Sequence, residues 1–215
     1  MSSIDGRIDC SMVDKISGNE FYSTLASLEC PSCVEGKVTT LHYHSLPGHY
    51  VAKNSEKIAK ETWHKAVVAE RYQICPDTNG TLLWNPEQPT PLLILLSEKA
   101  PEEYLGYLRE RNISYIVTGK DRIDLTRAME ILGDLFGVKR LSVLGGGRIN
   151  GGFLSAGLID EISLLLAPGI DGRTSQPALF DGVANSPGFL PTRLELKSVE
   201  TITNGVLWIK YMIKP

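Results

Sequence analysis

The second half of the chain alternates short apolar runs with segments of helical periodicity, and this order constrains the fold more than any other feature. Helical segments begin near Pro101 and at Leu125, and Gly137 closes the second one. Strands that alternate with helices form a mostly parallel sheet with helices on both faces, so the order predicts an α/β domain. The apolar runs, all of strand length, lie at 92–96, 113–117, 140–144 and 162–167.

The remaining segments give weaker patterns. Two apolar stretches flank an Asn204-Gly205 turn and predict a C-terminal antiparallel hairpin that extends the sheet at one edge. Residues Ile4 to Cys10 are expected to end a first strand. We further expect helices at 20–28, around 56–63, at 101–111, 125–136 and 149–156, and strands at 32–35, 66–74, 81–84, 193–201 and 206–213.

Charge and hydropathy argue against several classes of protein. The formal net charge is −3, whereas a nucleic-acid-binding protein usually carries a basic excess. No apolar run approaches the roughly 18 residues of a membrane span, and the N-terminus has no apolar stretch of signal-peptide type. We therefore expect a cytoplasmic protein that binds neither nucleic acid nor membrane. Its length fits a single domain covering residues 1–215.

The four cysteines are compatible with a metal or redox site but do not define one. Cys30 and Cys33 have the spacing of a redox dithiol or of half a zinc site. A zinc site would need a second pair of ligands, and Cys10 and Cys75 stand alone. Buried or incidental thiols are the simpler interpretation, so we predict no metal site. A redox or zinc protein that uses Cys30 and Cys33 stays as an alternative.

Three consecutive glycines follow the apolar run that ends at Leu144. Gly145, Gly146 and Gly147 remove every side chain from a turn between a strand and a helix, so backbone N–H groups can approach a phosphate closely. Arg148 adds positive charge. The turn lacks the third glycine of a Rossmann fingerprint, because that position is Asn150, and no Gly-Lys-Ser/Thr follows as in a P-loop. The alternative is a tight turn that binds nothing.

Several motifs together resemble one family. The glycine turn is followed by Leu-Ile-Asp-Glu at 158–161, Ala-Pro at 167–168 and Leu-Phe at 179–180, and the chain opens with Ser-Ile-Asp-Gly-Arg-Ile at 3–8. This arrangement resembles the pyrimidine reductase domain of the bifunctional riboflavin-biosynthesis deaminase/reductase, a domain of the dihydrofolate-reductase-like fold. Gly-Lys-Val-Thr at 36–39 is similar to an element that follows the second strand in that wider fold.

The resemblance implies an NADPH-dependent reductase of a small heterocyclic substrate, acting as a homodimer. It places the cofactor near Gly36, Lys37, Thr39, Ser97, Lys99 and the turn Gly145, Gly146, Gly147 and Arg148. A lysine at position 99 suits a phosphate as a point charge, and its alternative is an ordinary surface lysine. A non-catalytic nucleotide-binding module with the same fold is the second reading of these residues.

Two carboxylates are the candidates for work at the substrate. Asp5 lies beside Gly6 at the expected end of the first strand, and its alternative is a plain Asp-Gly turn. Glu161 begins the run at 162–167, and its alternative is a solvent-facing charge at a strand end. The chain departs from the resemblance at Tyr43, where riboflavin-pathway reductases usually carry Asp, and it lacks the deaminase domain with its zinc motif. The family's first strand begins several residues before its Ser-x-Asp-Gly motif, whereas this sequence starts at Met1, so we expect either a true start upstream or a first strand that is cut short.

Overall fold

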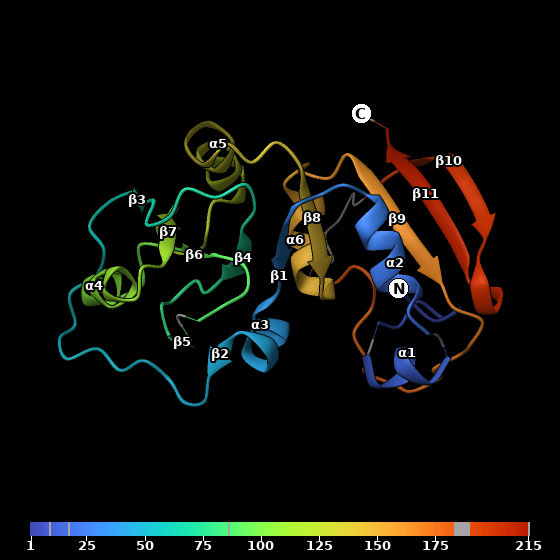
Figure 1. Ribbon diagram of the computed structural model, residues 1–215, viewed down its shortest axis with the longest axis horizontal. Coiled ribbons are helices and arrows are strands. Elements are labelled where there is room, and N and C mark those ends of the chain that lie inside the picture. Colours follow the sequence, from blue (N-terminus) through green and yellow to red (C-terminus); the bar gives the residue numbers. More distant parts are fainter. Residues whose placement is uncertain (9, 17, 86, 183–189, 215) are drawn as a thin grey trace. The chain divides into compact units, whose positions relative to one another are not determined.

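The computed structural model describes residues 1–8, 10–16, 18–85, 87–182 and 190–214. Its contacts divide the chain into two compact units (Figure 1). Unit 1 combines Met1–Glu29 with Gly146–Pro215, and unit 2 is the continuous stretch Cys30–Gly145. Each unit has its own sheet. Within the described residues, none of the helices has both the length and the apolar character needed to span a membrane.

Unit 2 is built on a six-stranded sheet in the order β3-β7-β6-β4-β1-β8. The pairs among β7, β6, β4, β1 and β8 are all parallel, and only β3 at the edge is antiparallel. The mostly parallel central sheet expected from the alternating pattern is therefore confirmed. The strands are β1 (Ser32–Glu35), β3 (Thr62–His64), β4 (Gln73–Pro76), β6 (Leu92–Leu96), β7 (Ser114–Val117) and β8 (Leu141–Gly145).

Two helices cover the faces of this sheet (Figure 1). Alternate residues of β6 point to opposite faces, and all five are buried. Ile94 and Leu96 belong to the core cluster that includes Leu105 and Leu108 of α4 (Glu102–Glu110). On the opposite face, Phe136 of α5 (Leu125–Phe136) meets Tyr72 edge to face, with 5.6 Å between ring centroids. Gly137 ends α5 in the left-handed conformation with φ 73°, as expected from the sequence.

The polar stretch before β4 differs from its prediction. The helix expected around 56–63 is wrong, because the stretch is extended and ends in β3, which pairs with β7. Side-chain bonds favour the extended path: Glu103 accepts hydrogen bonds from the backbone N–H of Lys53 and from Asn54. The strand expected at 66–74 starts only at Gln73. The short helix α3 (Lys37–Tyr43) and the paired strands β2 (Ser45–Leu46) and β5 (Leu83–Trp84) complete unit 2.

Unit 1 contains an antiparallel sheet in the order β10-β11-β9. The predicted C-terminal hairpin is present, but it pairs with β9 and not with the strands of unit 2. Its turn is the single-turn helix η1 (Thr203–Gly205). The strands are β9 (Glu161–Leu166), β10 (Leu194–Thr201) and β11 (Leu207–Ile213), and the helices are α1 (Cys10–Ile16), α2 (Glu20–Ser27) and α6 (Gly147–Ser155).

The first strand expected at Ile4 to Cys10 is wrong. Ser2 makes one isolated parallel bridge to Leu166, and the chain then turns at Asp5-Gly6 before α1 begins at Cys10. Gly6 has a φ of +76°, which only glycine adopts readily, and its N–H donates to the carbonyl of Ser3 at 3.0 Å. Turn chemistry at the Asp-Gly pair thus overrides the apolar pattern that suggested a strand.

Candidate functional site

The carboxyl ends of the parallel strands bring several predicted cofactor residues to one edge of unit 2. Gly36 follows β1, Ser97 follows β6, and Gly145 ends β8. Glu35 is in register with Gly145, and the N–H of Gly36 donates to the carbonyl of Gly145 at 2.6 Å. Ligands of open α/β sheets bind at this edge. The sheet order therefore unites residues that lie far apart in the sequence.

The helix α3 starts at this edge. Gly36 is its N-cap, with extended backbone and no side chain to cap the helix. Lys37 and Thr39 lie in the first turn, where Lys37 is exposed and Thr39 is half-buried. Three of the residues predicted near the cofactor therefore occupy one short segment, in which Gly36 is buried and Lys37 is exposed.

Asp77 belongs to a Pro-Asp-Thr-Asn-Gly segment whose composition alone predicts a turn, and it is a fully buried carboxylate directly after β4. Its Oδ2 accepts from the backbone N–H groups of Thr81 at 2.7 Å and Leu82 at 2.8 Å. Its Oδ1 accepts from the Thr81 hydroxyl at 3.1 Å and from Nζ of Lys37 at 3.2 Å. The turn explanation is correct for the backbone bonds, but no local pattern indicates the contact with Lys37, which lies 40 positions earlier.

Ser97 and Lys99 are close to the same edge but use their polar atoms within the protein. Ser97 is buried, and its hydroxyl donates to the carbonyl of Thr78 at 2.9 Å. Nζ of Lys99 lies 3.0 Å from Oδ1 of Asp121, and both side chains are more than half exposed. An exposed pair of this kind exchanges partners at little cost. Lys99 is therefore available to another anion, whereas the Ser97 hydroxyl is committed to the turn.

The three-glycine turn continues into α6 of unit 1. The structural constraint differs at each of its glycines. Gly145 has a φ of +97°. A Cβ on Gly147 would clash with the carbonyl oxygen of Ala178 and lie 2.8 Å from Oδ2 of Asp181. A Cβ on Gly146, the N-cap, would have only Cδ1 of Ile8 as a neighbour, at 3.8 Å. Internal packing thus requires Gly147, whereas the space beside Gly146 is open.

The start of α6 suits an anion. The N-cap residue Gly146 makes no side-chain hydrogen bond, so among the described residues the first N–H groups of the helix lack a capping side chain. Arg148 follows in the first turn and is exposed. The open space beside Gly146 is a place that a side chain would fill, and the residues present therefore fit a phosphate group of a nucleotide.

Asp5 is the centre of a hydrogen-bonded loop in unit 1. It accepts from the Ser3 hydroxyl at 2.6 Å and from the backbone N–H groups of Asp171 and Gly172, both at 3.0 Å. These bonds, with that of Ser3 first, lower the pKa of the Asp5 carboxyl well below its usual range. Asp5 is therefore ionised, and part of its bonding capacity goes to the loop that follows β9.

Glu161 lies elsewhere in unit 1. It starts β9 and forms an ion pair with Lys197 of β10. Ser2 and Ile4, next to Asp5, bond near the other end of β9, at Leu166 and Gly169. Six strand residues span roughly 17–20 Å. The structure therefore does not bring the two candidate catalytic carboxylates together.

Two thiols of unit 2 have a raised pKa: that of Cys33, which is half-buried, and that of Cys75, which is buried. Sγ of Cys33 donates to Oε1 of Gln73 at 2.9 Å, and burial raises the pKa of Cys33 to about 11. Burial likewise raises the pKa of Cys75 to about 12. Across the described ranges, no three His, Cys, Asp or Glu side chains gather in a way that could hold a metal ion.

A histidine that the sequence did not single out belongs to a polar cluster near Gly36. The ring of His44 lies between Oε2 of Glu35 at 3.2 Å and Oε1 of Gln88 at 3.3 Å. The signal in the sequence was only the proximity of His44 to the Gly-Lys-Val-Thr segment. The cluster ties the C-terminal end of α3 to β1.

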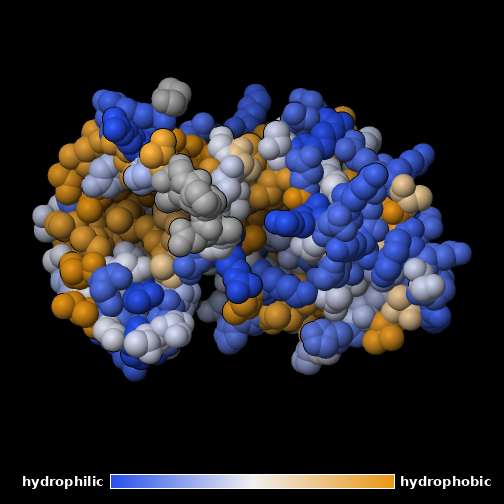
Figure 2. Space-filling view, turned by 180° about the vertical axis from the view of Figure 1, so that it is seen from behind, coloured by the Kyte–Doolittle hydropathy of each residue, from blue (hydrophilic) through white to orange (hydrophobic). Residues whose placement is uncertain are grey.

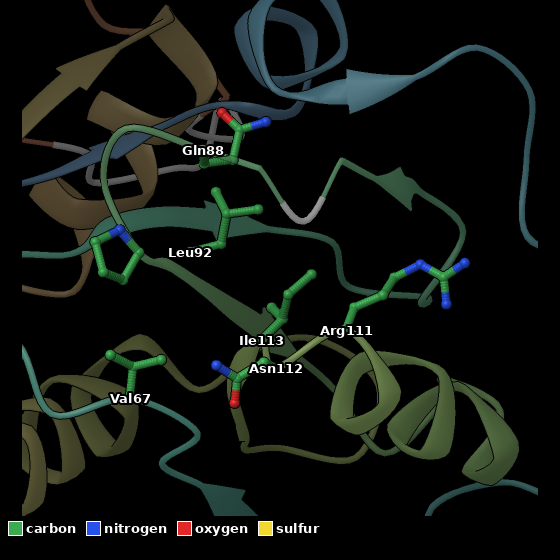
Figure 3. Close-up of a pocket in the computed structure, with 7 residues that line it drawn as sticks. Val67, Gln88, Leu92, Arg111, Asn112 and Ile113 are labelled. Carbon is green, nitrogen blue, oxygen red and sulfur yellow. The ribbon is translucent and has the colours of Figure 1, made fainter.

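A surface pocket of unit 2 shares Gln88 with the His44 cluster (Figure 3). It is lined by Val67, Gln88, Leu92, Arg111, Asn112 and Ile113, together with Pro91. Leu92 begins β6 and Ile113 directly precedes β7, so the pocket opens at the amino ends of the strands. The carboxyl edge, with Gly36 and Gly145, is the opposite one. We therefore do not assign the pocket to the cofactor.

The fold defines an α/β protein with a mostly parallel central sheet. A family model described as the RibD C-terminal domain matches residues 34–208. The chain belongs to this family, which confirms the resemblance seen in the motifs.

Reductases from three microorganisms are similar in sequence to this chain. The chain is 35% identical over 130 residues to the 2,5-diamino-6-ribosylamino-4(3H)-pyrimidinone 5′-phosphate reductase of Methanothermobacter thermautotrophicus, a stretch that covers 60% of this chain and 58% of that protein. Proteins of the same name from Aquifex aeolicus and Archaeoglobus fulgidus are 35% and 33% identical over 43% and 53% of this chain. These two matches cover 41% and 48% of the relatives, so the chain spans about half the length of the curated relatives it matches.

Solved structures share the fold. A pyrimidine reductase-like protein from Corynebacterium diphtheriae superimposes with a TM-score of 0.73 at 18% identity, covering 100% of this chain and 89% of that chain. RibD from Acinetobacter baumannii gives a TM-score of 0.64 at 15% identity over 99% of this chain and 56% of that one. The mixed α/β architecture is thus that of RibD reductase domains.

Proposed function

We propose that the chain is an NADPH-dependent pyrimidine reductase of riboflavin biosynthesis. The observation that carries the proposal is the turn at Gly146, which keeps an open, uncapped helix N-terminus within a member of the RibD C-terminal domain family. The names of the curated relatives point to a ribosylaminopyrimidine phosphate as substrate. The related 5-amino-6-(5-phosphoribosylamino)uracil is the other substrate of this class that the family resemblance suggests.

The cofactor residues of the proposal lie in two groups. Gly36, Lys37, Thr39, Ser97, Lys99 and Gly145 belong to unit 2, and Gly146, Gly147 and Arg148 open α6 in unit 1. In unit 1 the backbone N–H groups of α6 and the charge of Arg148 would suit a phosphate, and in unit 2 the charges of Lys37 and Lys99 would do so. When bound, NADPH supplies the hydride. Gly147 acts indirectly, because its missing side chain lets the segment at 178–181 lie against the helix.

In this reaction the protein orients the substrate and balances the charge of the substrate. Asp5 is the better of the two candidate carboxylates, because it is ionised and held rigidly by three hydrogen bonds. Glu161 has a lysine partner already, so its role toward the substrate requires that Lys197 share it. Tyr43 takes the place of the family's usual Asp, and its exposed side chain leaves that contact to another residue.

Nucleotide binding and turnover test the proposal separately. NADPH at 100 times its dissociation constant should stabilise the fold by about 2.7 kcal/mol in thermal unfolding, and the ribosylaminopyrimidine phosphate should drive oxidation of NADPH. Binding without turnover on the substrate would favour the alternative, a non-catalytic nucleotide-binding module. The absence of any thermal shift with NADPH or NADH would contradict both.

The proposal includes a homodimer in the cytoplasm. The sheet of unit 1 presents an apolar face to solvent, which gives the broad hydrophobic area of Figure 2. Leu194, Leu196 and Val199 of β10 are 41–55% exposed on it, and they pair in register with Ile213, Tyr211 and Ile209 of β11. A large exposed apolar patch marks an interface. The unpaired thiols of Cys33 and Cys75 are typical of a reducing compartment. We also propose that residues 1–215 act as one domain.

A further inference from the structure

We propose that Asp77 is a positioning residue for the cofactor, because it holds the Lys37 ammonium at the carboxyl edge of the sheet, where that ammonium meets a phosphate of the nucleotide. The inference rests on the proposed function. It assigns a role to a carboxylate that neither the motifs nor the glycine turn had connected with the cofactor.

Asp77 has a fixed position. Its carboxylate is fully buried, and it accepts from two backbone N–H groups, those of Thr81 and Leu82, and from the Thr81 hydroxyl. The Tyr104 hydroxyl lies 3.1 Å from Oδ2, shares its proton with the nearer carbonyl of Leu82 at 2.6 Å, and receives a bond from Nε1 of Trp84 at 2.7 Å. Because Tyr104 and Trp84 are fully buried, this support is rigid.

Lys37 is the mobile partner of the pair. Its side chain is 43% exposed, whereas that of Asp77 is 0% exposed. The bonds from Thr81, Leu82 and Tyr104 already satisfy most of the lone pairs of Asp77, so the carboxylate does not depend on the lysine for its bonding. The fixed carboxylate of Asp77 therefore determines the position of the Lys37 ammonium, and not the reverse.

The pair leaves the ammonium able to bind a ligand. Nζ of Lys37 lies 3.2 Å from Oδ1 of Asp77 and 2.7 Å from the Thr81 hydroxyl. An ammonium has three N–H donors, and among the residues that the structure describes these two contacts use two of them. One donor and nearly half of the side chain remain accessible. A lysine held in one place loses less entropy on binding a phosphate than a free one.

The sheet order places this cation among the other phosphate candidates. Asp77 follows β4, which lies between β6, followed by Ser97, and β1, followed by Gly36. The ammonium therefore sits centrally along the carboxyl edge of unit 2. A positive charge there favours an anionic group of a ligand bound at this edge.

The substitution Asp77→Asn isolates this role. The amide oxygen takes the position of Oδ2 and keeps the bonds from Thr81, Leu82 and Tyr104. The amide NH₂ then takes the position of Oδ1 and opposes the Lys37 ammonium, donor against donor. Lys37→Met removes the ammonium itself. Tyr104→Phe is the matched control, because it weakens the support of Asp77 and lowers stability but leaves Lys37 in place.

Dissociation constants for NADPH, NADH and 2′,5′-ADP should be measured for each variant by titration calorimetry. We expect Asp77→Asn and Lys37→Met each to weaken NADPH binding by about tenfold, the usual loss for a hydrogen bond to a charged group. The double variant should be no weaker than Lys37→Met alone. A loss confined to NADPH and 2′,5′-ADP identifies the 2′-phosphate as the partner, and an equal loss for NADH identifies the pyrophosphate.

A second readout needs no nucleotide. Lysine acetylation followed by mass spectrometry should modify Lys37 faster in Asp77→Asn than in the wild type or in Tyr104→Phe, because the ammonium is released. If the wild type binds NADPH and Asp77→Asn binds it equally well, the inference is wrong and the proposed function stands. If the wild type binds no nucleotide, both are wrong. A double variant far weaker than Lys37→Met would also overturn the inference, since Asp77 would then act independently.

Discussion

The Glu20 carboxylate accepts a hydrogen bond from Nδ2 of Asn204 at 2.6 Å and so joins the start of α2 to the turn between β10 and β11. It also accepts from the Gly18 N–H at 2.6 Å and the Thr203 hydroxyl at 3.0 Å. Its side chain is buried, yet local hydrogen bonds hold the pKa of Glu20 below the ordinary value of 4.5. The hairpin turn is thus fixed by an acid 184 positions earlier in the chain.

Replacing Glu20 by Gln should loosen the hairpin turn. The amide has one oxygen, so it cannot accept from Gly18, Thr203 and Asn204 as the carboxylate does. We expect the melting temperature to fall by roughly 2–5 °C, measured by circular dichroism at neutral pH. Thr203→Val, which removes a single bond, should show a smaller decrease. Equal stability of Glu20→Gln and wild type would show that the contact contributes nothing.

Acid should destabilise unit 1 through Asp5 and Glu20. Both carboxyls have a lower pKa in the folded state than their ordinary values of 3.8 and 4.5. A lowered pKa means that the unfolded chain binds protons first, so the stabilisation is complete above the ordinary value and declines as the pH falls below it. Unfolding midpoints in urea should therefore fall between pH 5 and pH 3 by less in Asp5→Asn than in the wild type, with about the same slope.

Alkali should act on unit 2 through its thiols. Burial raises the pKa of Cys33 to about 11 and that of Cys75 to about 12, from an ordinary value of 9.0. The folded state keeps these thiols protonated, so their stabilisation is complete below pH 9 and is lost as the pH rises toward the folded values. A thiol reagent at pH 8 should label Cys75, which is fully buried, at the rate of unfolding. Fast labelling of Cys75 in the native protein would contradict its burial.

Two neighbouring glycines should respond differently to substitution. Gly146→Val should abolish nucleotide binding with little loss of stability, because its side chain enters open space. Gly147→Ala should lower the free energy of unfolding by about 1–3 kcal/mol, because its Cβ meets the Ala178 carbonyl. Calorimetric binding and denaturant unfolding separate the two effects. Unchanged affinity in Gly146→Val would refute its assignment to the cofactor.

Introducing a charge on the apolar face of the unit 1 sheet tests whether this face is the dimer interface. Leu196→Glu lies at the centre of this face, opposite Tyr211 of β11, and is 55% exposed. We expect it to convert a dimer to a monomer in light scattering, because a buried unpaired carboxylate is costly at an interface. Lys197→Glu points to the other face and serves as the control. A wild type that is already monomeric would refute the homodimer.

The regular elements were readable from the sequence wherever local and long-range signals agree. Leu125 to Phe136 has an apolar face, an Asp124 cap and a closing glycine, and the helix has those bounds. The helix predicted before Trp63 was wrong because the conformation there depends on pairing with β7 and on hydrogen bonds to Glu103, which lies over 40 positions away. The glycine turn was found because its chemistry is local. Asp77 and Lys37 were not connected, because only the order of β4 and β1 in the sheet brings them together.

Unit 2 is an uninterrupted stretch of chain, whereas unit 1 is assembled from both ends. On a ribosome, everything that unit 2 needs has been made once Gly145 has emerged. Unit 1 cannot form at that stage. Ser2 can pair only after Leu166 has been synthesised, and Glu20 can accept its hydrogen bond only after Asn204 has been synthesised. The first 29 residues therefore spend most of synthesis without their sheet. The hairpin of β10 and β11 comes last in the described part of unit 1, so the three-stranded sheet of this unit can form only after the hairpin has been synthesised.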